Sequence, residues 1–147
     1  MTHLETFTNE YSSTTPLISL EQGIIFIMGR SIPKDPVNFY APLQEWTDNY
    51  CKNYSGKTQI IIGFDHISTA SVKVIYNILR DFTEDTDIEN TTSVKWYYER
   101  ADDDLSELGK IFESLFPTNF RMIEVENIDK DFCKMVLKSK KNPINSI

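Results

Sequence analysis

The segment Thr58–Phe64, with the sequence TQIIIGF, constrains the fold of this chain more than any other stretch. Its apolar residues follow one another without the apolar/polar alternation that marks a strand with one face in water. Such a run is typical of a central strand in an α/β sheet that is covered on both faces. The total of 147 residues is enough for one domain of this kind and favours one domain over two.

Further strands and helices are predicted on both sides of this segment. Apolar periodicity, turns and caps predict strands over residues 17–20, 24–28, 58–64, 93–99 and 119–125 and helices over 36–52, 68–82 and 102–116. Gly23 joins the first two strands as a hairpin, and Pro42 predicts a kink or a restart in the first helix. The order ββαβαβαβ predicts an α/β fold with a mixed sheet of about five strands, the later ones parallel, and helices packed against it.

The two ends of the chain carry weaker signals than the middle. Residues 1–14 are interpreted as a flexible N-terminus, residues 15–126 as the folded domain, and residues 127–147 as a lysine-rich C-terminal extension with a short, loosely docked helix. The first residues lack the basic and then apolar order of a secretory signal. Cys51 and Cys133 match no metal or redox spacing, so we interpret them as reduced thiols and expect a cytoplasmic protein.

The net charge of −7 is concentrated in one part of the chain. From Asp81 to Glu107 ten acidic residues stand against Lys95 and Arg100, which gives −8 for this stretch and +1 for the rest. The ten are Asp81, Glu84, Asp85, Asp87, Glu89, Glu99, Asp102, Asp103, Asp104 and Glu107. Such a surface repels phosphate backbones and anionic lipids, so we expect neither nucleic acid nor direct membrane binding. Protein partners fit this charge better.

Residue patterns for catalysis, nucleotide binding and metal binding are incomplete. The five glycines are isolated and form neither a P-loop nor a dinucleotide fingerprint, and the sequence contains no G-x-S-x-G elbow. The carboxylates of Asp102–Asp104 favour a helix start over a metal site, because adjacent helical side chains point in different directions. We therefore expect no cofactor, no metal and no enzymatic activity. A small enzyme built on Asp65, His66 and Arg30 is the alternative, and Arg30 alone fits either an anion contact or one structural ion pair.

Three hydroxyl residues, Ser68, Thr69 and Ser71, lie at the predicted start of the second helix. Hydroxyls at this position commonly accept hydrogen bonds from unpaired backbone N–H groups and so cap the helix. Phosphorylation of Thr69 is a second interpretation, because negative charge is tolerated at the positive end of a helix. Such a modification changes what the surface binds without unfolding the protein, and Asp65 is expected to add to the repulsion of a partner.

Several segments together resemble the SiaC family of small bacterial regulatory phosphoproteins. The segments that carry the resemblance are Gly29–Pro33 (GRSIP), Phe39–Tyr40 with Pro42 and Trp46, Ser68–Thr69 with Ser71 and Lys73, and Val94–Glu99 (VKWYYE) followed by the acidic run and Gly109. They occur in the family's order over about residues 15–125. The family is similar in fold to STAS domains, the anti-sigma-factor antagonists, so the resemblance implies a STAS-like sheet.

The resemblance implies a partner switch controlled by phosphorylation of Thr69. In the family a dedicated protein kinase phosphorylates the matching threonine, and a PPM-type phosphatase removes the phosphate. The unmodified protein binds and activates a diguanylate cyclase, which raises cyclic di-GMP and favours biofilm or aggregation. The residues expected to contact the partner or the kinase are Arg30, Asp65, His66, Ser68, Ser71 and Lys73. An anti-sigma-factor antagonist with the same phosphoswitch, or another protein-binding module regulated by phosphorylation, is the alternative.

Overall fold

The computed structural model describes residues 5–54, 56–83, 92–116 and 118–141. Its strands form one mixed sheet in the order β1-β2-β3-β4-β5-β6. They are β1 (Phe7–Asn9), β2 (Leu17–Glu21), β3 (Ile24–Ser31), β4 (Thr58–Ile67), β5 (Thr92–Glu99) and β6 (Asn119–Val125). The first three strands pair antiparallel, whereas β3, β4, β5 and β6 run parallel. The predicted α/β class and the parallel later strands are confirmed.

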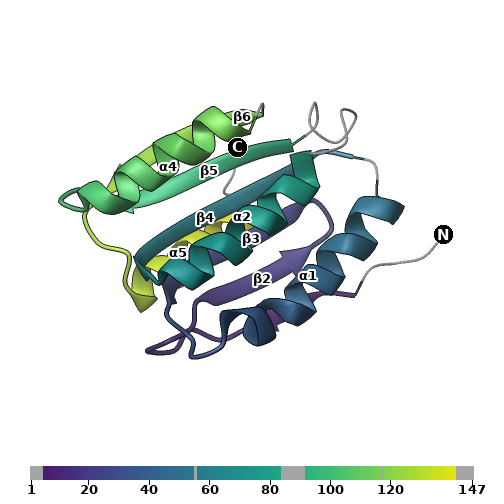
Figure 1. Cartoon of the computed structure of the whole chain (residues 1–147), viewed down its shortest axis with the longest axis horizontal. Coiled ribbons are helices and arrows are strands. Elements are labelled where there is room, and N and C mark those ends of the chain that lie inside the picture. Colours follow the sequence, from purple (N-terminus) through teal and green to yellow (C-terminus); the bar gives the residue numbers. More distant parts are fainter. Residues whose placement is uncertain (1–4, 55, 84–91, 117, 142–147) are drawn as a thin grey trace.

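Helices cover both faces of this sheet. The described residues form α1 (Pro36–Asn53), α2 (Thr69–Thr83), α4 (Asp103–Leu115) and α5 (Lys130–Lys141). Figure 1 shows α1, α2 and α4 on one face and α5 on the other. In β4, Ile60 and Ile62 belong to the core under the first three helices, whereas Ile61 belongs to the smaller core under α5. The unbroken apolar run of β4 therefore supplies both cores, as its sequence predicts.

Local signals around the first helix are confirmed in part. Gly23 has a φ of 92° in the β2–β3 turn, a conformation that favours glycine. Asp35 caps α1 by accepting a hydrogen bond from the Asn38 N–H at 3.1 Å. The restart allowed for at Pro42 is wrong, because α1 continues through it. Burial of Tyr40 and Leu43 on either side holds the helix in place where proline removes one backbone bond.

Both ends of the chain differ from the sequence interpretation. Residues 7–9, assigned to a flexible terminus, pair with β2 as an edge strand. Helix α5, assigned to a loosely docked extension, is anchored on the sheet through Cys133 and Val136, and the preceding Ile128 is fully buried beside them. The reason is that α5 covers apolar side chains that the underside of the sheet otherwise exposes to water.

Strand β3 is longer than predicted, and this matters for the site. The expected end was Gly29, but β3 continues to Ser31 after a register shift between Gly29 and Arg30. Arg30 therefore lies inside a strand and pairs in register with His66 of β4. Of the predicted acidic stretch, residues 84–91 lie outside the described residues, and so does Pro117, the predicted helix end.

Candidate functional site at the start of α2

Ser68 fixes the beginning of α2. Its backbone N–H donates a hydrogen bond to the Ser31 carbonyl at the end of β3 (2.9 Å), and its Oγ accepts one from the Ser71 N–H (3.2 Å). Its carbonyl accepts the first helical hydrogen bond, from the Val72 N–H at 3.0 Å. These are the bonds of an N-cap residue, so the capping interpretation is confirmed for Ser68.

The three hydroxyl residues of this segment lie in different environments. Ser71 is fully buried, and its Oγ accepts a hydrogen bond from Ser68 Oγ at 2.9 Å. Thr69, the first residue of α2, is exposed, and its hydroxyl has no hydrogen-bond partner among the described residues. Thr69 is thus the one hydroxyl residue of the three that is exposed and makes no side-chain hydrogen bond within the described residues.

A pocket of about 300 Å³ opens beside Thr69, between the end of β4 and the starts of α2 and α4. Its lining residues are Asp65, His66, Ile67, Thr69, Val72, Asp102, Asp104, Leu105 and Leu108. Aliphatic side chains from both helices and the strand therefore share this pocket with carboxylates from the start of α4. We call it the Thr69 pocket.

Two other predicted residues, His66 and Lys73, lie on the same exposed surface. His66 lines the Thr69 pocket. Lys73 is exposed on α2, one helical turn after Thr69, so the two side chains lie on one face of the helix. The structure therefore brings three residues of the sequence prediction, Thr69, His66 and Lys73, to one surface.

Arg30 and Asp65 form an ion pair, with Nη2 of Arg30 3.0 Å from Oδ2 of Asp65. This hydrogen bond is the main reason why the pKa of Arg30 lies above its ordinary value. The negative charge of Asp65 also raises the pKa of Tyr11 and Cys133, after burial, and these residues pack on the α5 side of the sheet. The structural ion-pair interpretation of Arg30 is confirmed. The repulsion expected from Asp65 at Thr69 is offset by the Arg30 charge.

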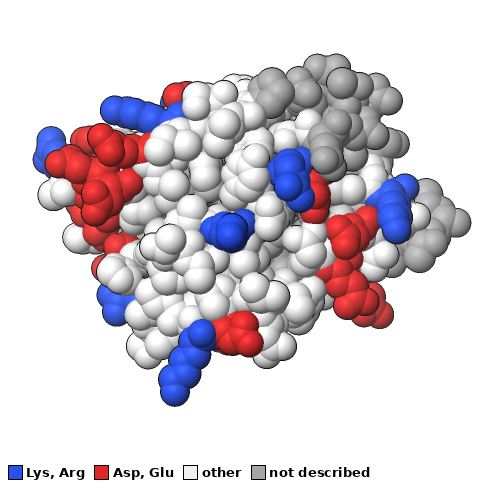
Figure 2. All heavy atoms as spheres, in the orientation of Figure 1, with Lys and Arg blue, Asp and Glu red and all other residues white. Residues whose placement is uncertain are grey.

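The carboxylates whose charge is not offset at the Thr69 pocket come from the start of α4. Asp102 caps α4 by accepting a hydrogen bond from the Leu105 N–H at 3.0 Å, which confirms its helix-start interpretation. Asp102 and Asp104 also line the Thr69 pocket, and neither forms an ion pair with another described residue. On their other side lies an acidic hollow of about 580 Å³. Figure 2 shows acidic side chains gathered at the end of the molecule where α4 begins.

Sequence reasoning missed that the acidic helix start borders Thr69. A signal was available, because β4 and β5 are parallel and the segments that follow them emerge at the same edge of the sheet. Within the described ranges no group of three or more His, Cys, Asp or Glu side chains is placed to hold a metal ion. No helix in the described part of the chain combines the length and the hydropathy that a membrane span requires.

The sequence matches the model of a known family over most of its length. Residues 9–125 match the SiaC family regulatory phosphoproteins. The chain belongs to the SiaC family. The family resemblance carried by the GRSIP and VKWYYE segments is confirmed. An uncharacterized protein of Pseudomonas aeruginosa strain UCBPP-PA14 is 20% identical over 103 residues, which cover 69% of this chain and 82% of that protein.

Solved SiaC structures share the fold. The crystal structure of apo-SiaC from Pseudomonas aeruginosa has a TM-score of 0.74 and 18% identity, and the match covers 81% of this chain and 98% of that chain. The same TM-score and identity hold for a chain in the structure of the diguanylate cyclase SiaD in complex with its activator SiaC, where 81% and 99% are covered. These likenesses show that the chain has the SiaC fold, and the family description is that of a regulatory phosphoprotein.

Proposed function

We propose that Thr69 is the phosphoacceptor of this regulatory phosphoprotein, and that the unphosphorylated form binds and activates a diguanylate cyclase. One observation carries the proposal: the Thr69 hydroxyl is exposed at the start of α2 and bonded to nothing in the described fold. The Pseudomonas aeruginosa relative SiaC is the activator of a diguanylate cyclase, SiaD, which supports this class of partner. A cyclase activated in this way raises cyclic di-GMP and so favours biofilm.

The start of α2 accommodates a phosphoryl group without a change of fold. The group brings about −1.5 to −2 charges to the positive end of the helix dipole, where negative charge is stabilised. Lys73 lies four residues along the same helix face and offers an ammonium group at (i, i+4) spacing. Ser68 keeps its capping bonds to Ser71, because these use the Ser68 oxygen and not that of Thr69.

The same group changes the Thr69 pocket for a partner. Before modification, the pocket offers aliphatic contacts from Val72 and Leu108 next to the small threonine side chain. A phosphoryl group fills part of this space, brings water with it, and places negative charge beside Asp102 and Asp104. Each 1.4 kcal/mol of lost binding free energy lowers the affinity for the partner protein about tenfold. Burying one charge in the interface without an opposite charge or hydrogen-bond donor beside it costs at least that much.

Reversibility requires that two enzymes reach the same oxygen. We propose a dedicated protein kinase that transfers phosphate to Thr69 and a PPM-type phosphatase that removes it. The buried Ser71 and the capping Ser68 are less suitable acceptors, because transfer to either one breaks the hydrogen bonds that begin α2. This difference predicts one modification site in the segment.

The test compares charge at two adjacent positions. Thr69→Ala is expected to keep cyclase binding and to remove its regulation, whereas Thr69→Asp weakens binding about tenfold or more. Ala70→Asp is the matched control, since Ala70 is also exposed in the first turn of α2 but does not line the Thr69 pocket. The measurements are copurification from cells with mass spectrometry of the partners and of Thr69, and then titration of the purified cyclase with cyclic di-GMP formation as the readout.

Two results would contradict the proposal. One is that phosphorylated and unphosphorylated protein bind and activate the cyclase equally. The other is that Ala70→Asp weakens the cyclase complex as much as Thr69→Asp does, because charge anywhere on the helix start would then explain the effect.

A further inference from the structure

The underside of β5 and β6 carries a cluster of cations. Val94 and Trp96 belong to the core under α2 and α4, so Lys95 between them points to the opposite face. Arg121 of β6 is the register partner of Lys95, and their side chains leave the sheet side by side. The ammonium group of Lys140 of α5 lies close to that of Lys95. We call Lys95, Arg121 and Lys140 the cationic cluster.

The described part of the fold does not neutralise this cluster. None of the ion pairs among the described residues includes any of its members. The contact with Lys140 lowers the pKa of Lys95 to about 8, and burial and the charges of Lys140 and Arg121 act in the same direction. Three cations held together without a carboxylate repel one another, and a bound anion relieves that repulsion.

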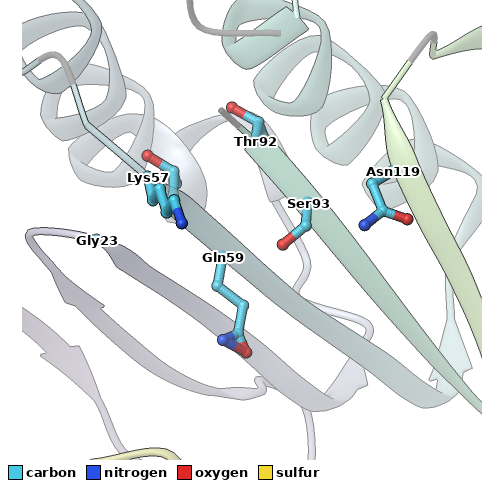
Figure 3. A pocket seen from close by; sticks show the side chains of 7 residues that line it. Gly23, Lys57, Gln59, Thr92, Ser93 and Asn119 are labelled. Atoms are coloured by element: carbon cyan, nitrogen blue, oxygen red, sulfur yellow. The ribbon is translucent and has the colours of Figure 1, made fainter. Parts of the chain in front are cut away.

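A pocket of about 380 Å³ lies at the starts of β4, β5 and β6, and its wall includes polar side chains. Ser93, two residues before Lys95, pairs in register with Gln59 on one side and Asn119 on the other. Figure 3 shows these three side chains on adjacent strands at the wall of the pocket. The side-chain oxygen of Gln59 is buried and accepts no hydrogen bond from any described residue. We call Gln59, Ser93 and Asn119 the polar row.

We propose that this face binds a small phosphorylated molecule. The cationic cluster holds its phosphoryl group through charge-assisted hydrogen bonds, and Arg121 supplies the planar fork that suits phosphate oxygens. The uncharged part of the molecule lies in the pocket, where the polar row offers donors and acceptors, among them the unsatisfied oxygen of Gln59. The site is separate from the proposed phosphoswitch, because Gln59 is near the start of β4 and Thr69 follows the opposite end of the same strand.

A small ligand fits the electrostatics better than a nucleic acid or a membrane does. The whole chain has a net charge of −7, so a large polyanion that meets the cluster also meets the acidic remainder of the surface. A small molecule stays within the local field, because charges farther away than about 8 Å are largely screened at physiological ionic strength. The pocket volume of about 380 Å³ also lies in the usual range for small-molecule sites.

The test uses adenosine 5′-monophosphate as the probe, with adenosine and inorganic phosphate for comparison. Amide chemical shifts of the full chain are followed by NMR up to roughly millimolar probe. We expect the monophosphate to shift amides of residues 93–97 and 119–123 and to leave those of 68–73 unchanged. Adenosine should not shift them, and inorganic phosphate should act on the cluster with lower affinity than the monophosphate.

Three variants locate the site. Lys95→Gln and Arg121→Gln are each expected to lower the affinity for the monophosphate about tenfold, because each removes one charge-assisted interaction. Lys138→Gln is the matched control, because Lys138 is exposed on the same helix as Lys140 and its replacement changes the net charge equally. Urea unfolding confirms that each variant is folded.

The proposal is overturned if neither the monophosphate nor phosphate shifts these amides, if adenosine binds as well as its phosphate, or if Lys138→Gln weakens binding as much as Lys95→Gln. It is also overturned if the Lys95-dependent ligand is a single-stranded oligonucleotide or a phosphatidylglycerol vesicle and the monophosphate does not bind. None of these results bears on Thr69, so failure here is distinguishable from failure of the proposed function.

Discussion

Ser68 and Thr69 are neighbours in the sequence, but their side chains lie in different environments. The Ser68 side chain completes hydrogen bonds at the start of α2 and also donates to the buried Ser71. The Thr69 side chain makes no hydrogen bond to a described residue and faces a pocket. Under the proposed function, Thr69 regulates docking by carrying charge, and such a residue is best placed where the fold does not depend on its side chain.

This difference between the two side chains predicts opposite results for two alanine variants. Ser68→Ala should lower the free energy of unfolding by about 1–2 kcal/mol, because a capping bond is lost and Ser71 keeps a buried hydroxyl without its partner. Thr69→Ala should change it by no more than about 0.5 kcal/mol. Urea unfolding monitored by circular dichroism measures both. Equal destabilisation by the two variants would show that Thr69 is structural and would weaken its assignment as a switch.

At the scale of elements, the position of α4 depends on one glycine. Gly109 lies against the indole of Trp96, and a Cβ built there would be 2.6 Å from Trp96 Cδ1 and 2.7 Å from Met122 Cε. Trp96 is fully buried, and its Nε1 donates to the Leu105 carbonyl at 3.1 Å, so the ring has no room to move away. This close approach brings the start of α4, with Asp102 and Asp104, next to Thr69.

Gly109→Ala should therefore destabilise the protein by about 1–3 kcal/mol through overpacking, although alanine favours a helix by about 1 kcal/mol over glycine. The substitution should also weaken binding of the proposed cyclase partner, because it displaces one wall of the Thr69 pocket. Lys110→Ala, at an exposed neighbouring position, is the control and should change little. Urea unfolding followed by tryptophan fluorescence gives the stability, and an unchanged stability in Gly109→Ala would mean that α4 does not rest on Trp96 as described.

At the scale of the whole molecule, the sequence predicts what local chemistry determines and misses what depends on spatial neighbours. The unbroken apolar run of β4 and the cap at Asp35 follow from adjacent residues and their period, whereas the exposure of Thr69 could be read only from the structure. Strand β1 has three residues and is held by pairing with β2, so its own sequence carries almost no signal. The docking of α5 depends on apolar side chains of β2, β3 and β4, and the acidic wall of the Thr69 pocket depends on how α4 lies beside α2.

Buried ionisable groups predict how the whole fold responds to alkaline pH. Burial raises the pKa of the Cys133 thiol to about 12 from 9.0, and it raises the pKa of Tyr40 and Tyr50 to about 12 from 10.0. The unfolded chain releases these protons near the ordinary values while the folded chain keeps them, so stability falls as pH rises from 9 towards 12. Lys95 acts in the opposite sense, because contact with Lys140 lowers its folded pKa to about 8 and the unfolded state holds the proton up to about 10.5.

The two effects occupy different pH windows and can be separated by variants. Between pH 8 and 10.5 the folded protein loses the Lys95 proton more easily than the unfolded chain does, which adds stability and offsets the onset of Cys133 ionisation in the unfolded chain. Above pH 10.5 this gain no longer grows, and the raised pKa values of the buried thiol and phenols make stability fall. Urea midpoints measured from pH 7 to 11.5 should show this break. Lys95→Gln should remove the gain at lower pH and leave the fall, while Cys133→Ala should make the fall shallower. A midpoint that stays level up to pH 11.5 in the unmodified protein would mean that these three buried groups ionise as readily in the fold as in the open chain.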